Sequence, residues 1–289
     1  MPSNEQRRQA AKRKLERQLE RRAERARKHK QMTIGAAVLG VVLVVAAGAL
    51  VYGLTGSDDS SDASTEAAAT QESTAGTMPT GRAQALPASV DCTYIPDGQT
   101  PSKPATLPAA SAVSAEGTVT VNMVTNQGPI GLNLDRAESP CTVNSMVSLA
   151  QQGYFNDTPC HRLSTTGLKI LQCGDPSGQG TGGPGYGFVN EFPTDQYGPD
   201  DANAQQPVTY ARGTIAMANT GQPGSNGSQF FLVYDDSPLP PQYTVFGTIS
   251  DEGLATIEKV AAAGDDASMS AGGGKPNTPV QIQTATVAA

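Results

Sequence analysis

The sequence predicts a mainly β globular domain with two short helices, which follows a membrane-spanning helix and a flexible linker. Three observations support this interpretation: an uncharged apolar stretch at residues 32–54, a stretch rich in Ser, Thr and Pro at residues 55–112, and alternating apolar residues from Thr118 onward. The chain of 289 residues then divides into a basic segment (1–31), a transmembrane helix (32–54), a linker (55–112) and a globular domain (113–289).

The N-terminal segment is strongly basic. Residues 1–30 contain 12 Lys or Arg and 4 Glu, a net charge of +8, which leaves −15 for the rest because the whole chain carries −7. Pairs such as Arg17–Glu20 and Glu24–Lys28 have the spacing of a solvated helix. Anionic lipid headgroups are its expected partner. Nucleic acid is the weaker alternative, because no aromatic or base-reading residues are interleaved with the charges. Scaffold assembly through this helix is a further hypothesis.

The stretch from Met32 to Leu54 contains no charged residue. About 20 such residues, at 1.5 Å per residue, span a bilayer core of about 30 Å. Its length and long basic flank favour an uncleaved anchor over a signal peptide, although Ala46–Ala49 offers small residues. The basic flank places the N-terminus in the cytoplasm, so we expect a single-pass protein of the cell membrane with its globular domain outside.

Residues 55–112 contain few large apolar side chains, so they are expected to remain a flexible linker. Val90–Pro96 is an exception that could dock on the domain. An extracytoplasmic location permits disulfides, and the sequence leaves all three pairings open. Zinc is the competing hypothesis, but no two cysteines have close ligand spacing, and no metal site is expected. The four cysteines are Cys92, Cys141, Cys160 and Cys173.

The domain begins with clear local patterns. Residues 118–135 alternate twice between apolar and polar residues around the turn-forming Asn126–Pro129, which predicts a β-hairpin. Ser139-Pro140 then introduces apolar residues at helical spacing up to Gly153. Later apolar runs between Gly-, Pro- and Asn-rich loops are typical of an antiparallel barrel or sandwich. These runs lie at 168–171, 213–218, 229–233 and 244–249, followed by a short helix at 254–260 and a last strand at 280–284.

Conventional hydrolase chemistry has little support. Beyond the apolar stretch the chain has one histidine, His161, which is expected to be a structural residue of a strand. The glycine-rich run Gly178–Phe188 lacks the Lys-Ser or Lys-Thr ending of a phosphate-binding loop, so it is interpreted as a surface loop.

Four sequence blocks carry a family resemblance: HRLSTTGLKILQCGD (161–175), GQGTGGPGYGF (178–188), AMANTGQPGSNGSQFFLV (216–233) and VFGTI (245–249). Each resembles a signature block of the cyclophilins, and the four occur in the family's order. The resemblance implies a closed eight-stranded antiparallel β-barrel capped by two α-helices, with a substrate groove on its outer face. It also implies a peptidyl-prolyl cis-trans isomerase without a cofactor that acts on proline-containing polypeptides. Together with the expected topology, this predicts an enzyme that assists folding of extracytoplasmic proteins.

The resemblance assigns roles to residues. Arg162 matches the arginine that donates a hydrogen bond to the prolyl nitrogen, which weakens the amide resonance behind a rotation barrier of about 18–20 kcal/mol. Gln172 matches the glutamine that holds the substrate backbone and supports this arginine. Ala218 and Asn219 match an edge that pairs with the substrate as an added strand. The expected substrate-binding residues are Phe231, Ile170, Leu239, Ala218, Asn219, Gln229, Tyr243 and Leu168.

The chain also departs from the family pattern. The stretch between Arg162 and Gln172 is two residues longer than in the common family block. Leu168 or Lys169 replaces the usual pocket phenylalanine. The family's tryptophan and histidine near the groove are replaced by Pro238 and Tyr243. Tyr243 could still donate a hydrogen bond to a substrate carbonyl, whereas loss of the indole donor argues against tight cyclosporin binding.

Two questions stay open at the level of sequence. A Cys160–Cys173 disulfide is conceivable if these residues are cross-strand partners, and Cys92 could instead tie the linker to any of the other three cysteines. The altered pocket also motivates an alternative function, a catalytically weak cyclophilin-like module that binds proline peptides.

Overall fold

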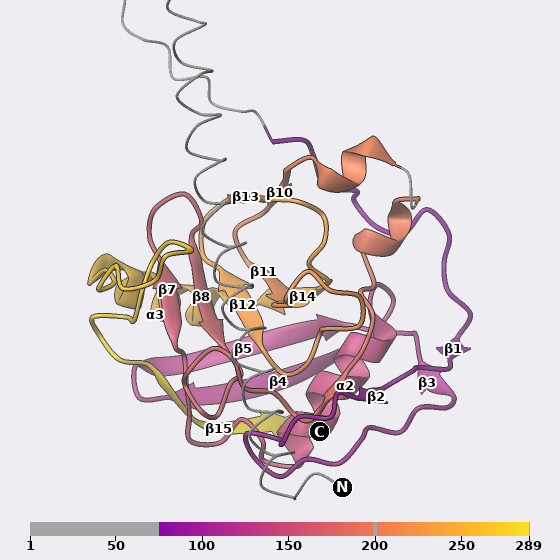
Figure 1. Ribbon diagram of the computed structural model, residues 1–289, viewed down its shortest axis with the longest axis horizontal. Coiled ribbons are helices and arrows are strands. Elements are labelled where there is room, and N and C mark those ends of the chain that lie inside the picture. The colour runs from indigo at the N-terminus through magenta and orange to yellow at the C-terminus, as the bar shows by residue number, and fades with distance from the viewer. Residues whose placement is uncertain (1–74, 199–200, 289) are drawn as a thin grey trace, which may run out of the picture. The chain divides into compact units, whose positions relative to one another are not determined.

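The structure is a computed structural model that describes residues 75–198 and 201–288 (Figure 1). The basic segment 1–31, the predicted transmembrane helix 32–54 and residues 55–74 lie outside the described residues. Within the described ranges, no helix has the length and apolar character needed to span a bilayer.

One antiparallel sheet of nine strands forms the domain, and it curls around the hydrophobic core (Figure 1). Its strands follow one another in the order β6 (Thr158–Pro159), β15 (Gln281–Val287), β4 (Thr118–Thr125), β5 (Gly128–Asp135), β14 (Val245–Ile249), β11 (Thr214–Met217), β12 (Phe230–Val233), β8 (Ile170–Cys173) and β7 (Arg162–Ser164). Three pairs of short strands and two 3₁₀ turns lie outside this sheet: β1 (Ser89–Val90) with β3 (Val113–Ser114), β2 (Ile95–Pro96) with β9 (Tyr186–Gly187), β10 (Val208–Tyr210) with β13 (Ser237–Leu239), η1 (Thr194–Gln196) and η2 (Ala202–Gln205).

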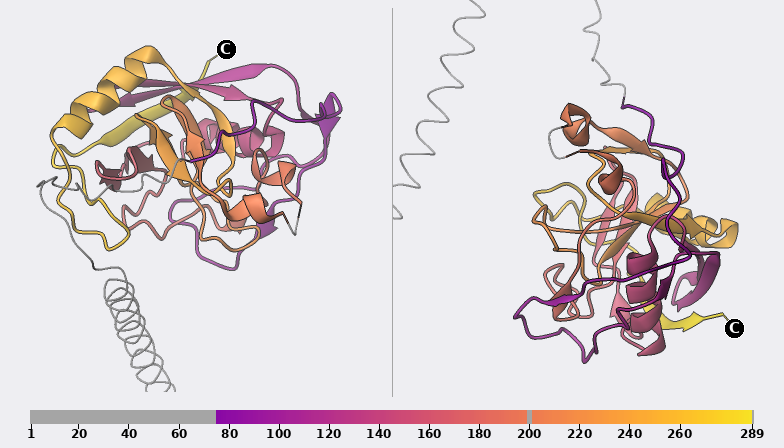
Figure 2. Two further views of the ribbon diagram at one scale, coloured as in Figure 1. Left: turned by 90° about the horizontal axis from the view of Figure 1, so that it is seen from above. Right: turned by 90° about the vertical axis from the view of Figure 1, so that its right-hand side faces the viewer.

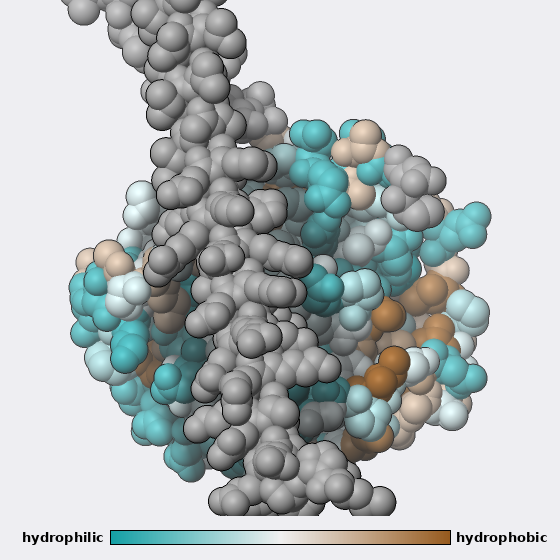
Figure 3. All heavy atoms as spheres, viewed as in Figure 1, coloured by the Kyte–Doolittle hydropathy of each residue, from teal (hydrophilic) through white to brown (hydrophobic). Residues whose placement is uncertain are grey.

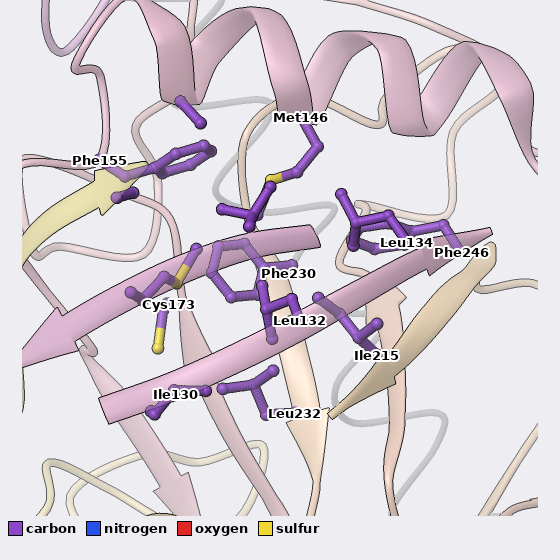
Figure 4. Close-up of a cluster of buried hydrophobic side chains, with 14 of the residues drawn as sticks. Ile130, Leu132, Leu134, Met146, Phe155, Cys173, Ile215, Phe230, Leu232 and Phe246 are labelled. Atoms are coloured by element: carbon purple, nitrogen blue, oxygen red, sulfur yellow. The ribbon is translucent and has the colours of Figure 1, made fainter. Parts of the chain in front are cut away.

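The predicted hairpin is confirmed. β4 and β5 pair along their whole length, from Thr118 opposite Asp135 to Thr125 opposite Gly128. Alternate side chains of both strands are buried, because successive residues of a strand face opposite sides of the sheet. Figure 4 shows Ile130, Leu132 and Leu134 of β5 in the core beside Phe230.

The sheet does not form the closed eight-stranded barrel that the family resemblance implied. It has nine strands, and no pairing joins its edge strands β6 and β7 within the described residues. The outer edge of β7 instead pairs with a C-terminal loop, since the backbones of Leu163 and Gly274 exchange hydrogen bonds of 2.8 and 2.9 Å. β6 has only two residues, and its Pro159 has no N–H to donate.

Both predicted helices are present, as α2 (Pro140–Gln151) and α3 (Asp251–Ala262), and they lie at opposite ends of the curled sheet (Figure 2). Ser250 caps α3 by accepting a hydrogen bond from the Gly253 N–H. The N-terminus of α2 is capped from elsewhere in the chain: the Glu191 carboxylate accepts hydrogen bonds from the N–H groups of Cys141 and Thr142 at 3.1 and 2.7 Å. Burial raises the pKa of Glu191, against the opposing effect of these hydrogen bonds.

Residues 75–112 differ from the flexible linker that the sequence predicted, because they pack on the domain. The expectation that Val90–Pro96 docks there agrees with the structure: Cys92 forms a disulfide with Cys141, and the Tyr94 hydroxyl donates a hydrogen bond of 2.7 Å to the Cys141 carbonyl. Arg82 forms an ion pair of 2.7 Å with Asp195. A disulfide, polar contacts and a few buried side chains, such as that of Tyr94 in the core, thus hold this segment to the domain.

The surface of the domain is mainly hydrophilic on the side shown in Figure 3, outside the part that grey atoms cover. Apolar residues gather toward the right of that view, over the region of β2 and α2 in Figure 1. The large apolar side chains that are most exposed are Ile95 and Val189, at 59% and 60%.

The Cys92–Cys141 disulfide closes a loop of 49 residues and holds the N-terminal segment to α2. We expect the Cys92→Ser/Cys141→Ser double variant to lower the free energy of unfolding by about 2–4 kcal/mol, because the unfolded chain gains freedom. Urea unfolding of the purified full chain, followed by tyrosine fluorescence, measures this change. Ala88→Ser in the same segment is the control. Equal stability of the double variant and the wild type would contradict the prediction.

Candidate active site

The register of four adjacent strands places the predicted site residues in one row. Arg162 on β7 is opposite Gln172 on β8, Gln172 is opposite Phe231 on β12, and Phe231 is opposite Ala216 on β11. Directly opposed residues share one face of a sheet, so these side chains project from the same side. The Cys160–Cys173 disulfide joins the chain just before Arg162 to the residue just after Gln172.

The Arg162 guanidinium is held by three hydrogen bonds. Its Nη1 donates to Gln172 Oε1 at 3.4 Å, its Nε to the Gly272 carbonyl at 3.1 Å, and its Nη2 to the Ala271 carbonyl at 3.1 Å. Burial lowers the pKa of Arg162, although a guanidinium stays charged in proteins. Of its five N–H donors, two are not used by these bonds, so a fixed cation still has donors available for a ligand.

Sequence reasoning did not identify Ala271 and Gly272 as residues that position the arginine. The run of glycines after α3 is the sequence feature that could have indicated them, because glycine permits close approach of two backbones. Gly273 has φ +73°, and a Cβ atom there would collide with the Leu163 carbonyl oxygen. A larger residue at 273 would therefore push the loop, and the two carbonyls that hold Arg162, away from β7.

A chain of side-chain amides continues from the arginine. The Gln172 Oε1 accepts from Arg162, and its Nε2 donates to Gln229 Oε1 at 3.0 Å. The Gln229 Nε2 in turn donates to the Gly182 carbonyl at 2.9 Å. Each amide has a defined orientation because its two ends have different partners. The predicted residues Arg162, Gln172 and Gln229 thus form one connected network.

The six predicted apolar and aromatic residues gather in a second hydrophobic cluster, separate from the main core. Phe231 and Ile170 are buried in it, at 3% and 2% exposure. The adjacent Phe230 belongs to the main core, as the alternation of a strand requires. The partly exposed residues that pack against the second cluster are Leu168, Ala218, Leu239, Tyr243 and Met78. Met78 is an addition, because the sequence placed it in the linker.

Tyr243 packs against this cluster. Its ring is edge-on to Phe231 at a centroid distance of 5.7 Å, and its phenol lies close enough to Arg162 to oppose the effect of burial on the pKa of that residue. Within the described residues, no hydrogen bond occupies the Tyr243 hydroxyl. This position fits the predicted role of a donor near the groove.

The predicted peptide-binding edge lies just beyond β11. The Ala218 N–H donates to the Gln229 carbonyl at 3.0 Å, whereas the backbone N–H and C=O of Asn219 have no partner in the described part of the chain. The Asn219 side chain is engaged, since its Nδ2 donates to the Gln242 carbonyl at 2.9 Å. Asn219 thus offers a ligand its backbone, and the side chain holds that backbone in place.

A buried aspartate organises the glycine-rich loop that follows β8. Asp175 is 0% exposed, and its Oδ2 accepts hydrogen bonds from the Ser177 hydroxyl and from the N–H groups of Gly180 and Gly182 at 2.8–3.0 Å. Burial alone would raise the pKa of Asp175, but these hydrogen bonds outweigh it and lower the pKa below its ordinary value. The loop expected from the sequence is therefore pinned to the site rather than free at the surface.

His161 is a buried residue whose Nδ1 has no hydrogen-bond partner among the described residues. It is 5% exposed, and burial lowers its pKa. The ring lies under the glycine-rich loop, since a Cβ atom on Gly180 would come within 3.3 Å of its Nε2. Across residues 75–198 and 201–288, no group of three or more His, Cys, Asp or Glu is placed to hold a metal ion.

The arrangement can bind an extended peptide and act on one of its amide bonds. The Asn219 backbone is free to pair with a peptide strand, the second cluster offers apolar surface to a ring, and Arg162 supplies a charged donor beside both.

Comparison with known proteins agrees with this geometry. Residues 120–287 match the family model described as "Cyclophilin type peptidyl-prolyl cis-trans isomerase/CLD".

The chain therefore belongs to the cyclophilin-type peptidyl-prolyl cis-trans isomerase family. It is 57% identical over 199 residues to a "Probable peptidyl-prolyl cis-trans isomerase B" of Mycobacterium leprae, over 68% of this chain and 66% of the relative. It is 58% identical over 196 residues to a protein of the same description from Mycobacterium tuberculosis, over 66% of this chain and 62% of the relative. The chain thus spans a little under two thirds of the length of both relatives.

More distant proteins match a smaller part of the chain. A Helicobacter pylori "Peptidyl-prolyl cis-trans isomerase" is 39% identical over 138 residues, which are 47% of this chain and 76% of that protein. A solved cyclophilin-type isomerase of Cryptosporidium parvum has 28% identity and a TM-score of 0.48, over 60% of this chain and 99% of that structure.

The hydrogen bonds to Asp175 make a testable contribution to stability. Because the pKa of the folded state is lowered, this contribution is present above the unfolded pKa of about 3.9 and is lost as the pH falls through the lower folded value. We expect Asp175→Asn to destabilise the full chain by about 1–3 kcal/mol at pH 7, because an amide NH₂ would face N–H donors. The difference from the wild type should shrink near pH 3, as measured by urea unfolding at both pH values. A difference that stays constant with pH would contradict this assignment.

Proposed function

We propose that the chain is an active peptidyl-prolyl cis-trans isomerase that acts on proline-containing polypeptides outside the cytoplasm and assists their folding. Arg162 is the proposed catalytic residue: its unused N–H groups donate to the prolyl nitrogen as the amide twists, which removes the lone pair from resonance with the carbonyl. No bond is made or broken, so the chemistry needs only positioning and a charged donor.

The observation that carries this proposal is the convergence of Arg162, Gln172 and Phe231 in one cross-strand row. The Gln172 amide would hold the substrate backbone, while the second cluster would take the proline ring. Strand pairing with the Asn219 backbone would keep the peptide extended beside them. The bonds to Ala271, Gly272 and Gln172 hold the guanidinium before substrate arrives, so little reorganisation is needed in the twisted state.

Removal of the Arg162 guanidinium tests the catalytic role. We expect Arg162→Ala to lower kcat/KM for cis-to-trans conversion of a proline tetrapeptide by about 10²–10³-fold, the usual loss when one transition-state donor is removed. Arg212→Ala is the matched control, because it removes an exposed guanidinium that pairs with Glu258 outside the site. Circular dichroism and thermal unfolding verify that each variant is folded.

The outcomes of this assay separate the two functions considered from the sequence. Loss of rate enhancement in Arg162→Ala alone supports the isomerase. No enhancement by the folded wild type, over an uncatalysed reaction of tens to hundreds of seconds, would exclude catalysis and leave the weak, peptide-binding alternative. Equal activity of Arg162→Ala and the wild type would remove Arg162 from the mechanism.

We also propose that residues 32–54 anchor the chain in the cell membrane with the catalytic domain outside. The uncharged apolar stretch, its basic N-terminal flank and the acidic residues after it support this topology. Two disulfides within the described domain agree with an oxidising compartment. The basic segment 1–31 would then contact anionic lipid headgroups on the cytoplasmic side.

The anchor predicts how the chain partitions and which part is accessible. In cells that express the full chain, alkaline carbonate should leave it in the membrane fraction, whereas a variant without residues 32–54 should be released. Protease added outside intact spheroplasts should remove the catalytic domain and spare an epitope tag placed before residue 1. Protection of the domain in intact spheroplasts would contradict the proposed topology, and carbonate release of the full chain would contradict the anchor.

A further inference from the structure

A second concave surface adjoins the proposed active site. It is a pocket of about 560 Å³, and it shares Gln172, Gln229 and the Ala218–Asn219 edge with that site. The remaining lining comes mainly from the glycine-rich loop 180–187 and from the loop 223–228. Because a peptide strand advances about 3.3 Å per residue, a peptide lying along Ala218–Asn219 brings residues within about three positions of its proline to this pocket.

The outer wall of this pocket comes from the N-terminal segment. Asp97, Gln99 and Thr100 line it, although the sequence placed all three in the linker. Two backbone hydrogen bonds fasten the segment to the glycine-rich loop: the Asp97 N–H donates to the Gly185 carbonyl at 3.2 Å, and the Ser102 N–H donates to the Gly183 carbonyl at 2.9 Å.

The glycines of the loop are required for this contact. A Cβ atom on Gly182 would collide with the Ser102 hydroxyl, and one on Gly185 would come within 2.7 Å of the Pro101 ring. The Lys103 ammonium, which follows in the chain, donates to the carbonyls of Gly153 and Asn156 at 3.0 and 2.7 Å. The wall is therefore part of the folded domain.

The pocket carries one charge at its surface. Asp97 is the only carboxylate among its lining residues, and no Lys, Arg or His lines it. The Asp97 Oδ1 accepts a hydrogen bond of 2.8 Å from the Gln99 N–H, while no bond occupies Oδ2 within the described residues. The second carboxylate in this region, Asp175, lies buried beneath the loop, where a Cβ atom on Gly182 would touch it. Both charges have the same sign, and neither forms an ion pair with a described residue.

We propose that Asp97 is a specificity-determining residue, which makes this pocket select a Lys or Arg side chain located within three residues of the substrate proline. The inference rests on the proposed isomerase function, because the peptide must lie along the Ala218–Asn219 edge. A long cationic side chain fits the lining: its aliphatic stem covers the glycines and the Pro184 ring, and its charged end reaches the exposed carboxylate at the wall.

Peptides of one length, each with a single proline, test the subsite. Lys, Ala or Glu is placed in turn at each of the three positions before the proline and the two after it, and kcat/KM of the full chain is measured by NMR exchange. At one position we expect Lys to exceed Ala by about two- to fivefold, the range of one solvent-accessible ion pair. Glu should fall below Ala at the same position, and 0.5 M salt should reduce both differences.

Two variants assign the preference to Asp97. Asp97→Asn keeps the oxygen that accepts from the Gln99 N–H, so the turn is retained, and the Lys-to-Glu ratio should fall to near one. Asp97→Lys should invert the ratio. Asp251→Asn, which makes the same chemical change on α3, is the control and should leave the wild-type ratio unchanged.

These measurements can contradict the role of Asp97 while the proposed isomerase function still holds. Equal rates for Lys, Ala and Glu peptides at all five positions, or a Lys preference that persists in Asp97→Asn, would exclude the subsite while the chain remains an isomerase. If no peptide is turned over, the proposed function fails, and calorimetric binding of the same peptides still tests whether Asp97 selects the cationic one.

Discussion

The lateral register of β7, β8, β12 and β11 is the constraint on which the rest of the site depends. It places Arg162, Gln172 and Phe231 side by side on one face of the sheet. A slip of one residue in any of these pairings would turn a whole strand over, since side chains alternate with a period of two. The guanidinium would then face the core, where an unpaired charge is strongly unfavourable. The geometry of the candidate site and the correct burial of Phe230 are therefore specified by the same pairing.

Two segments that are distant from these strands in sequence complete the site that this register begins. The loop after α3 supplies the carbonyls of Ala271 and Gly272 to Arg162 and also covers the outer edge of β7. The segment before β4 contributes Met78 to the cluster around Phe231 and forms one wall of the neighbouring pocket. A sheet that is not closed by its own strands thus has its edge covered and its groove extended by loops.

The replacements in this chain change the polarity around the candidate site while leaving Arg162 in place. Tyr243, which the sequence comparison aligned with the family's histidine, packs edge-on against Phe231 and carries a hydroxyl that can donate a hydrogen bond. Pro238, at the position of the family's tryptophan, lies in β13 opposite Thr209 and offers no donor. The chain therefore combines the hydrogen-bonded Arg162–Gln172 pair with neighbouring residues, Pro238 and Tyr243, whose polarity differs from that of the family's tryptophan and histidine.

Local patterns by themselves determined the hairpin of β4 and β5, both helices and the assignment of Phe230 and Phe231 to opposite sides of a strand, because these depend on residues close in sequence. Family blocks located Arg162 and Gln172. Only the tertiary structure decided the cysteine pairing, the docking of residues 75–112, the capping of α2 by Glu191 and the support of Arg162 by Ala271 and Gly272. The contacts of Glu191 with α2 and of Arg162 with its two carbonyls join residues about 50 and 110 positions apart. No periodicity or spacing records which distant backbone group a folded chain brings to a given side chain.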